Sequence, residues 1–384
     1  MLNAETPTRF RNFRGGMFSP PMRIGSDGPP RLRRGGGDRL RVGLLIPLCG
    51  PAGLWGPSCQ CSAELATQEI NKQGGILGRE VELVVADAGG DPVDIARDVG
   101  DMVDDGEIDA VVGMHISAVR LALVKALKAR IPYVYTPLYE GGERRRGVFA
   151  TGETPDQQLR PAIAWLSEQK RARRWYLIGN DYVWPHVSHR AAKRFIAAAG
   201  GTVVGESYVP YGDDDHAAEL ETIRAAKPDA VLLSLVGGDA VTFNRSFAKA
   251  GLAKSMLRLS CAIEENTLLG IGADNTENLY SSSGYFANLD TPENAVFFDR
   301  YHATFGSRAP VPNALGESCY EGMRFYRQLA RQAGGTTVSA MAEAAKAVTW
   351  RGARGKITAK NHRVAMRIYL AQADGIDFRV IRQF

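Results

Sequence analysis

Hydroxyl and aromatic side chains follow three apolar, strand-like runs of this 384-residue sequence. Ser117, Tyr135 and Thr136 stand at the ends of two such runs in the first half of the chain. Tyr182 and Trp184 follow a third run in the second half. Hydroxyl groups orient compact polar ligands, and aromatic rings form the walls of small-molecule sites. We therefore expect these residues to bind a small polar organic molecule.

Three further residues at expected strand ends complete the candidate set. His115 has no carboxylate or nucleophile at a suggestive spacing, which favours a pocket-wall or structural histidine over a catalytic one. Gly237 lies in a glycine-rich approach to a helix, and Glu264 could accept a hydrogen bond from an ammonium or amide group, although a solvated carboxylate is the ordinary state. Ser117 is expected at a helix N-cap, where ordinary capping is the alternative to ligand binding. The candidate ligand-binding residues are Ser117, His115, Tyr135, Thr136, Tyr182, Trp184, Gly237 and Glu264.

The sequence contains no recognisable catalytic motif. An enzyme would need a nucleophile with a base, a metal cluster or a phosphate loop at usable spacing. The six histidines are scattered, G-x-S-x-G is absent, and the five cysteines form no CxxC pair. The first strand-to-helix turn has the spacing G-x-x-G-x-x-G instead of G-x-G-x-x-G, which makes dinucleotide binding a weak alternative. We expect no catalytic residue, no metal and no cofactor.

The positive charge is concentrated at the start of the sequence. The formal net charge is +5, but residues 1–41 hold nine arginines against three acidic residues, which is +6 and leaves −1 for the remainder. A nearly neutral body predicts no direct nucleic-acid binding by the folded part. Residues 1–40 are rich in Arg, Gly and Pro and have no apolar run typical of a signal peptide, so we expect a disordered arm and a cytoplasmic protein without a membrane span. A periplasmic location is the alternative if the start or leader is misread.

Strand-like and helical stretches alternate from residue 41 onwards, a rhythm typical of parallel sheets flanked by helices. The rhythm restarts after Thr154-Pro155, and the helical stretches beyond Leu279 fit better as completion of the first lobe than as a third domain. We predict an α/β fold of two doubly wound parallel-sheet lobes with a hinged cleft. The predicted division is an arm at 1–40, an N-terminal lobe at 41–152 plus 282–355, and a C-terminal lobe at 153–281 plus 356–384.

Several stretches resemble the type I periplasmic-binding fold of branched-chain amino-acid (Leu/Ile/Val) and amide binders. They are residues 70–79, DAGGDP at 87–92, YEG at 139–141, GNDYVWP at 179–185 and YFANLDTP at 285–292. The likeness spans residues 41–370 and is nearer to the AmiC group of cytoplasmic amide sensors. It implies that Ser117, Tyr135, Thr136, Tyr182 and Trp184 surround the ligand. His115 departs from the pattern, because the amide sensors have an aromatic residue there, and so does the shifted Thr136-Pro137 pair.

The resemblance implies one of two functions. The first is a non-catalytic sensor of short aliphatic amides that regulates an amidase or nitrile-hydratase operon by lobe closure, acting on a regulatory protein partner and capable of homo-oligomerisation. The second is the solute-binding component of an ABC transporter for branched-chain amino acids, urea or short amides. The missing signal-peptide pattern favours the sensor at this point.

Overall fold

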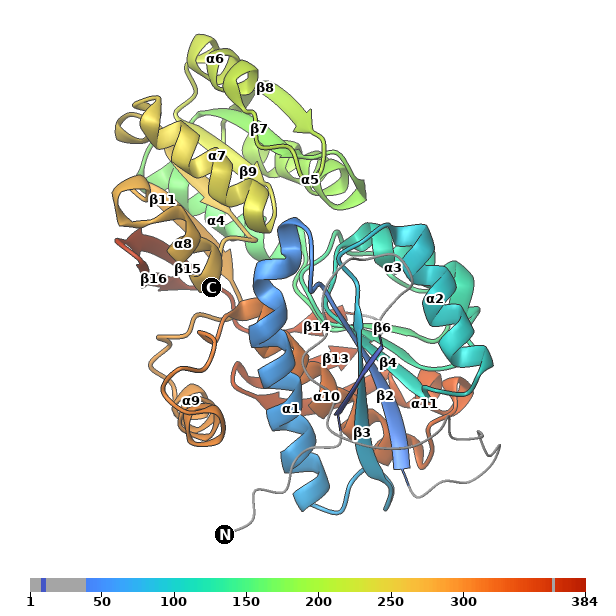
Figure 1. Cartoon of the computed structure of the whole chain (residues 1–384). Helices are drawn as coiled ribbons and strands as arrows, with labels where there is room; N and C mark the ends of the chain where they lie inside the picture. Colours follow the sequence, from blue (N-terminus) through green and yellow to red (C-terminus); the bar gives the residue numbers. More distant parts are fainter. Residues whose placement is uncertain (1–7, 12–38, 361–362) are drawn as a thin grey trace.

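The first lobe is built on a six-stranded sheet in which every pair of neighbours is parallel (Figure 1). The computed structural model describes residues 8–11, 39–360 and 363–384. Parallel strands are buried on both faces, which explains the nearly continuous apolar runs of the sequence. In sheet order the strands are β1 (Thr8–Arg11), β3 (Glu80–Asp87), β2 (Arg39–Ile46), β4 (Ala110–Gly113), β5 (Tyr133–Tyr135) and β6 (Val148–Ala150).

Helices cover both faces of this sheet. Successive strand residues point to opposite faces, so Leu44 packs with α1 and α10 whereas its neighbour Leu45 packs with α2 and α3. Local sequence signals start these helices: before α2, the Asp91 side chain accepts from the Val93 backbone N–H at 2.8 Å. The helices are α1 (Gly56–Lys72), α2 (Pro92–Asp104), α3 (Ser117–Leu127) and α10 (Ala314–Ala333), with the 3-10 turn η1 (Pro51–Trp55) before α1.

A small antiparallel sheet joins the first lobe on the far side of α10. Its strands are β12 (Ala347–Gly352), β13 (Gly355–Lys360) and β14 (Arg363–Ala365), preceded by α11 (Val338–Ala344). The rings of Trp350 and Phe325 lie 4.8 Å apart and pack β12 against α10. The predicted lobe boundary between residues 355 and 356 is therefore wrong, because it would divide β13.

The second lobe has a seven-stranded sheet whose first five strands are parallel and whose edge is an antiparallel hairpin. The predicted boundary between 281 and 282 is also wrong, because these residues lie inside one strand of this sheet. In sheet order the strands are β8 (Thr202–Val209), β7 (Arg174–Asn180), β9 (Ala230–Ser234), β10 (Leu257–Ser260), β11 (Leu279–Ser283), β15 (Tyr369–Asp374) and β16 (Asp377–Gln383). The predicted two-lobed α/β fold is confirmed, with an antiparallel edge that was not foreseen.

The helices of the second half again cover both sheet faces, except α9, which returns to the first lobe. Figure 1 shows α9 near α1. Arg300 of α9 pairs with Glu69 of α1 at 2.9 Å. The helices are α4 (Pro155–Gln169), α5 (Val183–Ala198), α6 (Ala217–Ala226), α7 (Gly237–Lys249), α8 (Glu265–Ile271) and α9 (Pro292–Phe305), with 3-10 turns η2 (Leu252–Lys254) and η3 (Ala273–Asn275).

Part of the predicted disordered arm is ordered. Thr8–Arg11 adds strand β1 to the edge of the first sheet, in parallel register with Leu83–Ala86 of β3, and β2 already begins at Arg39. Arg9 of β1 lies 2.6 Å from the carboxylate of Glu82. One positive charge of the predicted arm therefore forms an ion pair at the edge of the first sheet. The remaining positions of the predicted arm, 1–7 and 12–38, lie outside the described residues.

Three crossings of the chain between the lobes are held by one buried ion pair. Glu153 lies on the first crossing, Gly284 on the second and Met366 on the third. One Glu153 carboxylate oxygen accepts from the Gly284 N–H at 2.8 Å and from the Arg354 guanidinium at 2.7 Å. The same guanidinium nitrogen lies 3.5 Å from the Met366 sulfur. The pair therefore fixes the relative position of all three segments about which the lobes would move.

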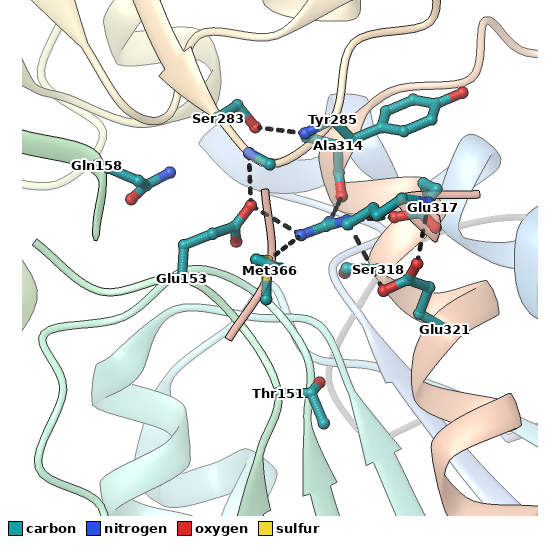
Figure 2. A network of polar contacts seen from close by, with 12 residues as sticks. Thr151, Glu153, Gln158, Ser283, Tyr285, Ala314, Glu317, Ser318, Glu321 and Met366 are labelled. Atoms are coloured by element: carbon teal, nitrogen blue, oxygen red, sulfur yellow. Dashed lines mark hydrogen bonds and ion pairs between the residues drawn. The ribbon is translucent and has the colours of Figure 1, made fainter. Parts of the chain in front are cut away.

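Two more carboxylates surround the same guanidinium (Figure 2). Glu317 lies 2.5 Å and Glu321 3.8 Å from the Arg354 Nε, all in the buried interior. Burial raises the pKa of both carboxyl groups, and the charge of Glu317 raises that of Glu321 further. One arginine cannot balance three buried carboxylates, so we expect Glu321 to keep its proton at neutral pH.

Candidate ligand-binding site

A cavity of about 30 Å³ lies between the two lobes, at the carboxyl ends of β4, β5, β7 and β9. Ligands of open α/β sheets bind at such strand ends. A volume of this size holds only one or two water-sized spheres, so an organic ligand would fit only if the lobes moved apart. The lining residues are Trp55, Met114, His115, Ile116, Ser117, Tyr135, Pro137, Leu138, Tyr182, Trp184, Val236, Ala262 and Leu315.

The polar end of the cavity belongs to the first lobe. The Ser117 hydroxyl donates to a carboxylate oxygen of Glu140 at 2.7 Å, and the Tyr135 hydroxyl donates to the His115 carbonyl at 2.8 Å. Glu140 is in turn paired with the guanidinium of Arg120. Ser117 is not the N-cap that the sequence suggested, because Ile116 takes that position and the Ser117 side chain makes no capping bond. Its hydroxyl is instead oriented by a loop carboxylate distant in sequence.

His115 is buried in this wall as a neutral ring. Burial lowers the pKa of its imidazole to about 4. Its Nδ1 lies 3.2 Å from the Ile116 carbonyl, which can only accept, so this nitrogen carries the proton. Its Nε2 then accepts from the Tyr133 hydroxyl at 3.0 Å. Both ring nitrogens are thus occupied within the lobe, which is the structural role that the sequence allowed.

The second lobe contributes aromatic rings to the opposite wall. Tyr182 is the N-cap of α5, and Trp184 lies in its first turn, with the two ring centroids 6.3 Å apart. Both aromatic residues therefore stand at the start of a helix, because α5 begins at Val183, directly after Tyr182. Burial raises the pKa of the Tyr182 hydroxyl, which therefore stays protonated. Both side chains line the cavity.

Three of the eight candidate residues do not line the cavity. Thr136 points to α10, where its hydroxyl lies 3.0 Å from the Ser318 hydroxyl. Gly237 begins α7 with φ of 54°, and a Cβ there would lie 2.0 Å from the Pro51 carbonyl oxygen of the other lobe. Glu264 caps α8 and accepts from the indole N–H of Trp55 at 2.8 Å. Gly237 and Glu264 therefore contact the other lobe directly.

Most of the cavity wall that sequence reasoning missed is apolar. Trp55 lies in the first strand-to-helix turn, at the end of η1, and is distinguished by its hydrogen bond to the second lobe. Met114, Ile116 and Leu138 adjoin residues that were predicted, so their positions next to strand ends were a usable signal. No sequence signal indicated Leu315, which lies at the start of α10. Only the return of the chain to the first lobe brings this residue to the cleft.

Two α/β lobes, three crossings and a cavity between facing strand ends are the architecture of a two-lobed small-molecule-binding protein. A family model described as periplasmic binding protein matches residues 39–377. This chain belongs to that family.

Relatives and solved structures agree with this assignment. The chain is 30% identical to the Leu/Ile/Val-binding protein BraC3 of Rhizobium johnstonii over 50% of this chain and 53% of that protein. It is 26% identical to the Leu/Ile/Val-binding protein homolog 3 of Brucella melitensis, over 78% of this chain and 81% of that protein. Its fold is similar to a solute binding protein of an ABC transporter from Rhodopseudomonas palustris HaA2 in complex with p-hydroxybenzoic acid, with a TM-score of 0.82, 21% identity, and 90% and 97% of the two chains covered.

The described residues contain no group of three or more His, Cys, Asp or Glu side chains arranged to hold a metal ion. Within the same part of the chain, no helix combines the length and apolar character that crossing a membrane requires.

Proposed function

We propose that this protein is the periplasmic solute-binding component of an ABC importer for a compact organic molecule with an apolar, ring-bearing body. Its partner would be the membrane part of that importer. The relatives named above are binding proteins for Leu, Ile and Val, and the structural neighbour is a transporter component, which favours the second sequence-based function over the amide-sensing regulator. The family description favours a periplasmic location over the cytoplasmic one.

The cavity wall carries the argument for a ring-bearing ligand. Trp55 of the first lobe and Tyr182 and Trp184 of the second line the same small space. Aromatic side chains pack most favourably against other flat apolar rings, which they contact by stacking or edge-to-face packing. The neighbour from R. palustris is described with p-hydroxybenzoic acid, a molecule of this shape.

The lining also disfavours a free amino acid as the best ligand. None of the lining residues is acidic, so an α-ammonium group would find no carboxylate on the cavity surface. Glu264, the candidate for that role, already accepts from Trp55, Asn266 and Thr267. A buried charge without a partner is costly, which weakens binding of leucine relative to a ring with a neutral end.

Binding measurements test this proposal directly. The purified chain would be heated with 4-hydroxybenzoate, benzoate, leucine, isoleucine, acetamide or urea, and compounds that raise the melting temperature would be titrated by calorimetry. We expect the aromatic compounds to raise the melting temperature of the protein most. A ligand present at 100 times its Kd adds about 2.7 kcal/mol to the free energy of unfolding, which such a measurement detects. Stabilisation by aliphatic amides alone would contradict the ring-bearing ligand and favour the sensor.

Cell fractionation tests the transporter assignment separately. We expect the protein in the periplasmic fraction and a loss of uptake of its ligand when the gene is deleted. A cytoplasmic protein whose deletion changes expression of an amidase, with uptake intact, would instead support the regulator.

A further inference from the structure

We propose that Cys59 of α1 and Cys319 of α10 form a disulfide bond that joins these two helices beside the ligand cavity. The pair is then a site of oxidative modification inside the first lobe. This inference rests on the proposed periplasmic location, because disulfides form and persist in oxidising compartments and are kept reduced in the cytosol.

The two helices approach each other closely around these cysteines. A Cβ placed on Gly316 of α10 would lie 3.0 Å from the backbone carbonyl carbon of Ser58, so the missing side chain permits backbone contact with α1. Asn313, the N-cap of α10, donates to the Ser58 hydroxyl at 2.7 Å. Cys59 directly follows Ser58, and Cys319 lies one turn after Gly316 on the same side of its helix. A disulfide needs Cα atoms about 4.4–6.8 Å apart, which two helices reach only where they pack this closely.

The two thiols are neighbours in the interior of the lobe. Both cysteines are fully buried and belong to one cluster of packed side chains. Burial raises the pKa of the Cys59 thiol, and the hydrogen-bonding thiol of Cys319 raises it further. The remaining cysteines are placed elsewhere, because Cys49 is exposed before η1 and Cys261 lies in the second lobe. Cys61 points to another side of α1, since two positions along a helix turn a side chain by about 200°.

Formation of the bond is an oxidation of two thiols. The Cys59 and Cys319 sulfurs each lose a hydrogen and join in one S–S bond, while the two electrons and two protons convert the disulfide of an oxidising thiol–disulfide partner into two thiols. The exchange proceeds through a thiolate, which a buried thiol of raised pKa seldom forms. We therefore expect the bond to form while the chain folds, before the core closes. Burial then protects both sulfurs from reductants.

The bond lies one helical turn away from the cavity wall on both helices. Trp55 precedes Cys59 by four residues, Leu315 precedes Cys319 by four, and both Trp55 and Leu315 line the cavity. Four residues make about one turn, so the bond fixes the spacing of these two wall residues. It also closes a long loop of the unfolded chain, which stabilises the folded protein.

Counting reactive thiols in the full natural chain tests the proposal. Protein from the periplasmic fraction would be quenched with acid, denatured and treated with a maleimide–polyethylene glycol reagent, with and without prior reduction. The sequence has five cysteines, so we expect three to react before reduction and all five after it. The intact mass should be about 2 Da below that of the reduced chain, and peptide mapping should find Cys59 linked to Cys319. Five reactive thiols before reduction, or a different linked pair, would overturn the proposal.

Serine variants measure what the bond contributes. Cys59→Ser and Cys319→Ser should each show four reactive thiols without reduction and a melting temperature lower by roughly 5 °C or more. Cys261→Ser is the matched control, because Cys261 is also buried but lies in the other lobe. It should keep the bond and show two reactive thiols before reduction. Where a variant does not fold, the thiol count of the natural chain still decides.

The outcomes distinguish this inference from the proposed function. The reduced chain refolded in a mixture of reduced and oxidised glutathione should form the bond whichever compartment the protein occupies in cells. If the bond forms there but the protein is found in the cytoplasmic fraction, the cysteine pair is supported and the periplasmic importer is contradicted. Five reactive thiols in both the periplasmic protein and the refolded chain overturn the disulfide and leave the importer intact.

Discussion

The indole nitrogen of Trp55 in the first lobe donates to Glu264 in the second at 2.8 Å, and both residues are buried. The Glu264 carboxylate also accepts from the backbone of Asn266 and Thr267, so it caps α8 while it holds the other lobe. The carboxylate that caps α8 is thus also a contact between the two lobes.

Trp55→Phe should weaken ligand binding by removing this bond. A hydrogen bond to a charged group contributes about 1.5–3 kcal/mol, which predicts at least roughly a tenfold rise in Kd. Calorimetry with the best ligand of the panel measures it. Trp350→Phe is the control, because its buried indole nitrogen has no partner among the described residues and lies outside the cavity. An equal loss in both variants would show that the Trp55–Glu264 bond is not responsible.

Gly237→Ala should favour the open form. The added Cβ would lie 2.0 Å from the Pro51 carbonyl oxygen of the opposite lobe, a clash that separation of the lobes relieves. We expect ligand affinity to fall more than tenfold, with a radius of gyration by small-angle scattering that no longer decreases on adding ligand. At Gly238 the nearest atom, the Pro51 Cα, would be 3.6 Å away, so Gly238→Ala should close normally. Normal closure of Gly237→Ala would contradict this reading of the interface.

Thr136 and Ser117 should respond differently to loss of their hydroxyls. Thr136→Val removes contacts with Gly113 and Ser318 inside the first lobe, which should cost about 1 kcal/mol of stability and leave ligand affinity unchanged. Ser117→Ala should instead reduce ligand affinity, because Ser117 lines the cavity. Urea unfolding and calorimetry on both variants measure the two effects. A large affinity loss in Thr136→Val would restore it to the candidate site.

Arg354→Met should be among the most destabilising single changes. It leaves Glu153 and Glu317 buried without their cation, and breaking a buried ion pair on one side costs about 3–5 kcal/mol. Urea unfolding measures the loss. Arg351→Met is the control, because Arg351 is 68% exposed and pairs only with Glu293 at 3.5 Å. A difference below 1 kcal/mol between the variants would show that the hinge does not depend on this pair.

Glu265 should make stability depend on pH. Burial raises the pKa of its carboxyl group to about 8, whereas an unfolded chain has a value near 4.3. Between these values the folded protein keeps a proton that the unfolded chain releases, so this contribution is full below about pH 4 and is lost as pH rises to 8. Glu265→Gln should remove that part, a few kcal/mol at most, from the difference in unfolding free energy between pH 5 and pH 8. An unchanged difference would contradict the raised pKa.

Local sequence signals were sufficient for most elements of the fold. The strand at 110–113 and the helices at 217–226 and 292–305 follow the local apolar periodicity, which acts within a few positions. The start of α5 at Val183 is less evident from the sequence, since Pro185 and two histidines interrupt its apolar face. The lobe boundaries near 281 and 355 failed because strand pairing joins residues that are distant in sequence.

By itself the sequence determined the two-lobed α/β architecture and the strand ends that supply Ser117, Tyr135, Tyr182 and Trp184 to one cleft. These features depend on the local pattern of apolar residues and on the fact that the carboxyl ends of parallel strands lie at the same edge of a sheet. Tertiary structure alone decided that Thr136 faces α10, that Glu264 binds Trp55, and that the Ser117 hydroxyl donates to Glu140. Such contacts join residues up to 209 positions apart, and the direction of a hydroxyl proton depends on which acceptor folding places beside it.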